Sequence, residues 1–96
     1  MDRLGRLIQS AQEHLEKGSL WRAYVAVESA ILDVKMRHAL ELEEPPAPPK
    51  RNAKKDDLLA DARSRLSRLD VSGDKKKLLY DLRACRDALK AALAKS

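Results

Sequence analysis

The sequence of 96 residues has no Phe, three isolated Gly residues and one Cys, and aromatic residues make up only 3% of it. The single Cys85 excludes a disulfide within the chain and is typical of a protein from a reducing compartment. Isolated glycines form no Gly-rich loop that would bind a phosphate group. The sequence therefore predicts neither a disulfide-stabilised fold nor a Gly-rich nucleotide-binding loop.

Long hydrophobic runs are also missing. The first segment, MDRLGRLIQSAQEHLEKG, lacks the apolar stretch of a signal peptide or a membrane span, so we expect a cytoplasmic protein. Side-chain amides are rare, with only Gln9, Gln12 and Asn52, whereas charged residues make up 36% of the chain. Few amides among many charges are typical of heat-adapted proteins.

The residues that are abundant predict helices. Hydrophobic residues make up 44% of the chain, mostly Leu, Ala, Val and Ile, and they alternate with Lys, Arg, Asp and Glu. This mixture is typical of helix bundles and coiled coils. The length fits one domain, so we expect residues 1–96 to form a single helical unit.

The first half of the chain predicts a helical hairpin over residues 2–42. A helix over residues 2–17 has one apolar stripe, Gly18 ends it, and Ser19 caps the helix that follows. The second helix, over residues 19–42, has two apolar stripes. One stripe consists of Leu20, Tyr24, Val27, Ile31 and Val34, and the other of Trp21, Val25, Leu32, Met36 and Leu40.

A helix with two apolar stripes is expected to be covered on both sides and to lie at the centre of the fold. We therefore expect the two later helices to cover the second stripe. Two interpretations of Trp21 are open: it closes the hairpin from within the core, or it is exposed and anchors a partner.

The second half predicts another hairpin behind a Pro-rich basic linker. Residues 44–55 contain four prolines and form an extended strap, because proline cannot continue a helix. Helices follow over residues 56–69 and 73–95, with a turn between them in which Asp70 or Ser72 caps the last helix. The expected fold is an all-α, four-helix up-and-down bundle of two hairpins (residues 2–42 and 56–95) joined by this strap.

The net charge of +5 lies in the linker and the second hairpin, since residues 1–44 carry a net charge of −2. An anionic partner such as RNA would therefore meet a patch there, with Tyr80 placed among the cations for stacking. The alternative reading is a solvated face of mixed charge. The candidate patch consists of Lys50, Arg51, Lys54, Lys55, Lys75, Lys76, Lys77, Arg83 and Lys90.

Catalytic and metal-binding patterns are absent from the sequence. His14 and His38 lie on different predicted helices, and a metal site needs three or four converging ligands. Cys85 falls on the apolar stripe of the last helix, where it is a small core residue or, beside Arg83 and Arg86, a reactive thiol. We therefore expect no enzyme activity, no cofactor and no metal.

The first hairpin resembles two known helical families. Gly18, Leu20, Ala23, Val27 and Ala30 follow the spacing of a tetratricopeptide-type hairpin. The segments LEKG (residues 15–18) and AVESAILDVK (residues 26–35) resemble HEPN-type four-helix bundles, and the likeness covers roughly residues 4–40. The HEPN resemblance implies a four-helix bundle, frequent dimers, and either RNA cleavage or a non-catalytic binding role. No Arg is followed four to six residues later by His, so the family's ribonuclease motif is missing.

The function expected from the sequence is a small, non-enzymatic interaction module that docks a protein partner or itself. Trp21 and Tyr80 are the candidate partner-binding residues, because exposed aromatic side chains anchor many interfaces. RNA or ribonucleoprotein binding through the basic residues is the alternative. We expect neither a membrane nor a small-molecule substrate as a partner.

Overall fold

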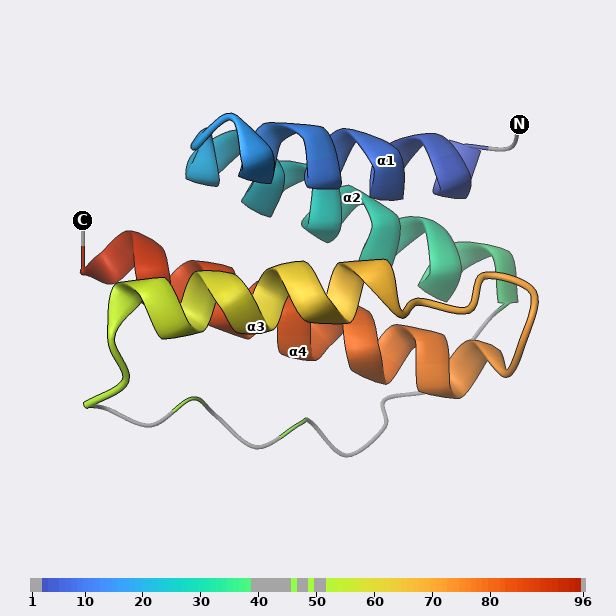
Figure 1. The fold of residues 1–96 in the computed structure, drawn as a ribbon. Coiled ribbons are helices and arrows are strands. Elements are labelled where there is room, and N and C mark those ends of the chain that lie inside the picture. The colour runs from blue at the N-terminus through green and yellow to red at the C-terminus, as the bar shows by residue number, and fades with distance from the viewer. Residues whose placement is uncertain (1–2, 39–45, 47–48, 50–51, 96) are drawn as a thin grey trace.

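The computed structural model of the protein describes residues 3–38, 46, 49 and 52–95. These residues form four α-helices and no strand (Figure 1). The helices are α1 (Arg3–Glu16), α2 (Leu20–His38), α3 (Lys55–Ser67) and α4 (Lys75–Ala94). The predicted all-α fold is confirmed, although the predicted continuation of the second helix to residue 42 lies outside the described residues.

The turn between α1 and α2 is built on Gly18. Its φ of 79° lies in the left-handed region, which glycine adopts without the steric cost of a Cβ atom. The Gly18 amide donates to the Leu15 carbonyl and the Ser19 amide to the His14 carbonyl, at 3.1 and 2.8 Å. These two bonds satisfy carbonyls that the helix end would otherwise leave unpaired. Gly18 therefore ends α1 as the sequence predicts.

The four helices pack so that each contacts two others. The contacting pairs are α1 with α2, α3 with α4, α2 with α4, and α1 with α3. In Figure 1, α2 and α3 begin at the end of the bundle where the C-terminus lies, and α1 and α4 begin at the opposite end. Every contacting pair is therefore antiparallel, and the predicted bundle of two hairpins is confirmed.

One hydrophobic core runs through this bundle. Each helix contributes the apolar stripe that its sequence spacing predicts, because residues three and four apart share a helix face. Leu82, Cys85 and Leu89 of α4 are fully buried at the centre. The residues that surround them include Leu4, Ile8, Ala11 and Leu15 of α1, Val27, Ile31 and Val34 of α2, and Ala62 and Leu66 of α3.

The second apolar stripe of α2 contradicts the sequence prediction. Trp21, Val25, Leu32 and Met36 are exposed, so α3 and α4 do not cover them, and Leu40 lies outside the described residues. The physical reason is geometric: of the three other helices in the described part of the chain, α2 contacts α1 and α4, and both lie against its other stripe. The prediction that α2 is a central helix covered on both sides is therefore wrong.

The cap of α4 also differs from the prediction. Asp74, rather than Asp70 or Ser72, is the N-cap residue, and its side chain accepts a hydrogen bond from the Lys76 amide at 2.9 Å. Asp70 instead accepts bonds from the amide and the hydroxyl of Ser72 and shapes the turn before the helix. The helix begins two residues later than expected, so the carboxylate next to its first turn is the one that caps it.

Half of the predicted Pro-rich strap, residues 44–55, lies outside the described residues, including Lys50 and Arg51. Pro46, which is described, is buried. Lys54 is the N-cap residue of α3, and Lys55 begins that helix, so the last two residues of the predicted linker belong to the second hairpin. The end of α2 and the start of α3 lie at opposite ends of the bundle (Figure 1).

Candidate functional site

Four large apolar side chains lie together on the solvent side of α2, a surface that we call the outer face of α2. Trp21 is 63% exposed, Val25 44%, Leu32 57% and Met36 74%. They occupy positions i, i+4, i+11 and i+15, which the helical period places in one narrow stripe opposite the core. Scattered exposed apolar residues are normal, whereas this many on one stripe mark a surface that calls for an explanation.

The aromatic end of this face is held in place by stacking. The rings of Trp21 and Tyr24 lie 5.6 Å apart between centroids, with an angle of 21° between their planes. Tyr24 is itself packed against the core, so it connects the exposed indole to the interior. Stacked aromatic pairs at this distance add stability beyond the area that they bury. The Trp21 ring is therefore exposed to solvent on one side and supported by Tyr24 on the other.

A groove runs beside the outer face of α2, between α2 and α1. One part of it is lined by α1 side chains and by Trp21, Arg22 and Val25, and the next part by Leu32, Asp33 and Met36. Ser29 lines both parts, so the two hollows adjoin at this small side chain. We call this the α1/α2 groove; its other lining residues are Arg3, Leu7, Ser10, His14, Ala26 and Arg37.

The charges around the groove are mostly positive. Three arginines line it, Arg3 and Arg37 in one part and Arg22 in the other, and all three are exposed. Among the described residues that line it, the one carboxylate is Asp33, whose side chain is buried and bonded through Oδ1 to Arg37 Nε at 3.2 Å. Its other oxygen, Oδ2, is buried without a hydrogen-bond partner among the described residues. The groove therefore presents cations to the solvent and keeps its carboxylate inside.

On the opposite flank of α2, the helix is tied to α4. Arg86 lies 3.3 Å from Glu28 Oε1 and bridges that carboxylate to Asp87 on its own helix. This cross-helix pair helps to fix α2 against the second hairpin. The groove lies on the other flank of α2, which faces α1.

Tyr80, the other predicted partner-binding residue, lies elsewhere. It is 44% exposed and belongs to the second turn of α4, whereas Trp21 belongs to the first turn of α2. Because α2 and α4 begin at opposite ends of the bundle, the structure does not bring the two aromatic residues together (Figure 1).

The predicted cationic patch is divided in the same way. Lys54 and Lys55 lie at the start of α3, and Lys75 to Lys77 at the start of α4, at the other end of the bundle (Figure 1). Lys75 donates from Nζ to the Val71 carbonyl, so its ammonium is engaged by the turn. Lys90 is exposed and Arg83 half-buried, both further along α4. The cations thus form no single patch among the described residues.

A small cationic pocket between α3 and α4 was not singled out from the sequence. Arg65, Arg68, Lys77 and Asp81 line it, and only Lys77 belongs to the predicted patch. Arg65 donates to Asp61 at 2.9 Å, and this bond raises the pKa of the guanidinium further above its ordinary value. Pairing with Asp61 and the presence of Asp81 reduce the positive field that an anion would meet there.

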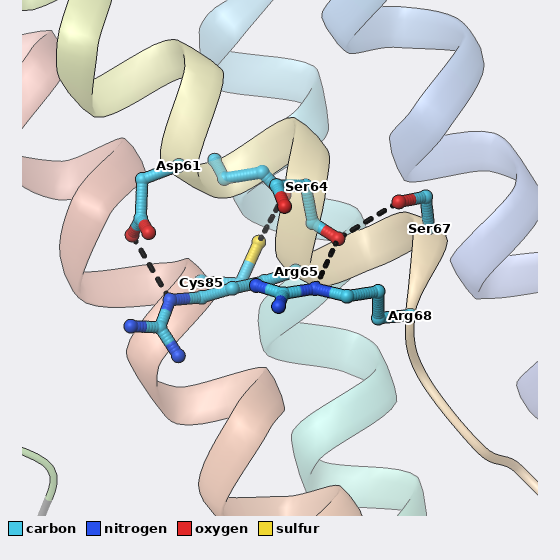
Figure 2. A network of polar contacts seen from close by, with 7 residues as sticks. Asp61, Ser64, Arg65, Ser67, Arg68 and Cys85 are labelled. Carbon is cyan, nitrogen blue, oxygen red and sulfur yellow. Dashed lines mark hydrogen bonds and ion pairs between the residues drawn. The ribbon is translucent and has the colours of Figure 1, made fainter.

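Of the two interpretations of Cys85, the structure supports the small core residue over the reactive thiol. Its sulfur points toward α3 and lies 3.7 Å from the Ala62 carbonyl, next to the Asp61–Arg65 pair (Figure 2). Burial, with a smaller contribution from Asp61, raises the pKa of the thiol to about 12. The reactive form of cysteine is the thiolate, so a buried thiol with this pKa serves as a core residue. Figure 2 also shows the Ser64 carbonyl accepting bonds from Ser67 and Arg68, which close the end of α3.

The two histidines are far apart. His14 lines the α1/α2 groove and is half-buried, while His38 is exposed at the end of α2. Among the residues that the structure describes, no three His, Cys, Asp or Glu side chains gather as metal ligands would. No helix within the described ranges is long and apolar enough to cross a membrane.

Comparison with known proteins gives no match. No family model matches the chain, and no curated protein and no solved structure shows significant similarity to it. The resemblances to HEPN bundles and tetratricopeptide hairpins therefore stay predictions.

Proposed function

We propose that this protein is a small, non-enzymatic helical-bundle module that binds a protein partner through the outer face of α2. The observation that carries the proposal is the single stripe formed by Trp21, Val25, Leu32 and Met36, exposed beside the α1/α2 groove. Large contiguous apolar patches on the surface of a folded domain mark sites of interaction.

The kinds of residues in this surface support the proposal. Trp, Met and Arg are enriched in protein interfaces, and Trp and Arg are frequent among the residues that carry most of the binding free energy. All three types occur within one stretch of α2. A partner that buried Trp21 and Leu32 would gain roughly 25 cal/mol for each Å² of apolar surface removed from water.

The test is affinity purification from cells that make the protein naturally, with the wild-type chain and a Leu32→Glu variant as baits. Nuclease treatment of each extract separates protein partners from those held by RNA. Ala60→Glu is the matched control, because Ala60 is exposed on α3 and receives the same charge. Circular dichroism of both variants checks that each remains folded.

We expect nuclease-resistant partners to be lost from the Leu32→Glu bait and retained on the Ala60→Glu bait. A charge placed at the centre of an apolar contact has to be buried unpaired when the partner binds, which weakens the complex strongly. Partners that both baits retain, or that nuclease removes from all baits, would contradict the proposal.

A further inference from the structure

The charges around the α1/α2 groove define the kind of partner. Building on the docking function proposed above, we propose that the groove binds an acidic amphipathic α-helix from another protein. The apolar side of that helix lies on the outer face of α2, and its flanking carboxylates meet Arg3, Arg22 and Arg37.

The shape of the surface favours a helix. Trp21 and Met36 are 15 positions apart on α2, which corresponds to roughly 22 Å at ~1.5 Å per residue. About four turns of a third helix, laid along the groove, would cover this length. Side chains at positions i, i+4, i+7 and i+11 of such a helix form one apolar edge that fits between two helices.

The charge of the groove selects an acidic helix. Arg22 stands beside the aromatic end, and Arg3 and Arg37 stand beside the Leu32–Met36 end, so cations flank both ends of the apolar stripe. Carboxylates on the flanks of an incoming helix would neutralise them, and opposite charges at the rim of an interface speed association and select the partner.

Arg37 is already oriented for this role. Its Nε is bonded to the buried Asp33 carboxylate, while about half of the Arg37 side chain, 52%, is exposed. The terminal guanidinium nitrogens carry further N–H donors, which suit the two oxygens of a second carboxylate. Asp33 therefore acts as a positioning residue that holds Arg37 at the edge of the groove.

Two other occupants fit the groove less well, one because of its charge and the other because of its shape. A second copy of this chain would bring its own Arg3, Arg22 and Arg37 against the same three arginines, with Asp33 buried on both sides. An anionic membrane would satisfy the arginines, yet a flat bilayer surface would leave the hollow at Ser10, Ala26 and Ser29 unfilled. A helix fits both the charges and the hollow.

Trp21 supplies the measurement, because it is the only Trp in the chain and is 63% exposed. Two stapled, Trp-free peptides with Leu at i, i+4, i+7 and i+11 serve as probes, one with Glu at the flanking positions and the other with Lys. We expect the Glu peptide to shift the emission of Trp21 to shorter wavelength in a saturable way. Its affinity should fall as salt is added, and the Lys peptide should produce no shift.

Charge reversal then tests the arginines. Arg22→Glu should weaken binding of the Glu peptide about fivefold, because a rim ion pair is worth about 1 kcal/mol and is replaced by repulsion. Arg63→Glu, at an exposed position on α3, is the matched control and should leave the affinity unchanged. Sedimentation of the free protein over a wide range of concentrations reports any self-association.

Each contrary outcome has a distinct meaning. Equal binding of the Glu and Lys peptides would overturn the acidic partner but leave the docking function. A concentration-dependent dimer that Leu32→Glu abolishes would do the same, in favour of a second copy. A shift produced by phosphatidylserine-containing vesicles and by neither peptide would overturn both proposals.

Discussion

Two leucine-to-alanine substitutions test whether the outer face of α2 is solvent-facing in the folded protein. Leu89 of α4 is fully buried, and Leu32 of α2 is 57% exposed, so the same chemical change is made in opposite environments. We expect Leu89→Ala to destabilise the protein strongly and Leu32→Ala to do so only slightly.

The magnitudes follow from the number of carbon atoms removed. Leu→Ala deletes three carbons, worth about 2.4 kcal/mol when fully buried at ~0.8 kcal/mol per methylene. At Leu89 the cavity left behind raises the expected loss to about 3 kcal/mol or more. At Leu32 less than half of the side chain is buried and no cavity forms, so the loss should be about 1 kcal/mol. The two free energies of unfolding should therefore differ by about 2 kcal/mol.

Urea unfolding followed by circular dichroism measures both values, provided that the slope against urea is the same for both variants. The measurement should be repeated at several protein concentrations, because a contact between two copies would make the apparent stability depend on concentration. A loss at Leu32 equal to that at Leu89, independent of concentration, would refute the exposed placement of the stripe. The protein's own chain would then cover the outer face.

Three further predictions concern the second hairpin. Burial raises the pKa of Cys85 from an ordinary value of 9.0 to about 12, so as pH rises the thiol of the unfolded chain loses its proton before that of the folded chain. The free energy of unfolding should therefore fall as pH rises from about 9 toward 12. Cys85→Ala should therefore flatten the decrease in the free energy of unfolding above about pH 9, as measured by urea titrations at stepped pH. Asp74→Ala should cost about 1 kcal/mol by removing the cap of α4, whereas Ser72→Ala should change the melting temperature little. If RNA binds at the start of α4, reversing the charges of Lys76 and Lys77 should reduce the slope of log affinity against log salt concentration by about one per phosphate contact. Reversing the charges of Lys54 and Lys55, at the opposite end of the bundle, should leave this slope unchanged. Binding that does not depend on salt would count against the RNA alternative.

The helices and the turn at Gly18 were predictable because local chemistry determines them. An apolar residue every three or four positions identifies the buried side of each helix, and glycine is the residue that adopts a positive φ at a helix end. The cap of α4 was missed because Asp70, Ser72 and Asp74 all have side chains that can cap. The choice among them depends on where the first helical turn begins, which the sequence fixes only to within a residue or two.

The candidate site was only half predictable. Trp21 and the second stripe of α2 are visible in the sequence, but their exposure is not, since periodicity shows that a face is apolar without showing what covers it. The arginines of the groove were not singled out from the sequence. Arg22 and Arg37 both belong to α2, and a projection of that helix alone would have placed them to one side of the stripe. Arg3 belongs to α1 and joins them only once α1 lies antiparallel to α2.

The arrangement of the bundle explains why the outer face of α2 stays uncovered. In a ring of four helices each member contacts two neighbours, and two neighbours bury one stripe of a helix rather than its whole circumference. The core stripe of α2 consists of Ala23, Val27, Ala30, Ile31 and Val34, and α1 and α4 fill it completely. A second apolar stripe on the same helix has no structural use within these four helices, and it costs solubility. We propose that a partner buries this stripe, and the arginines beside it favour an acidic one.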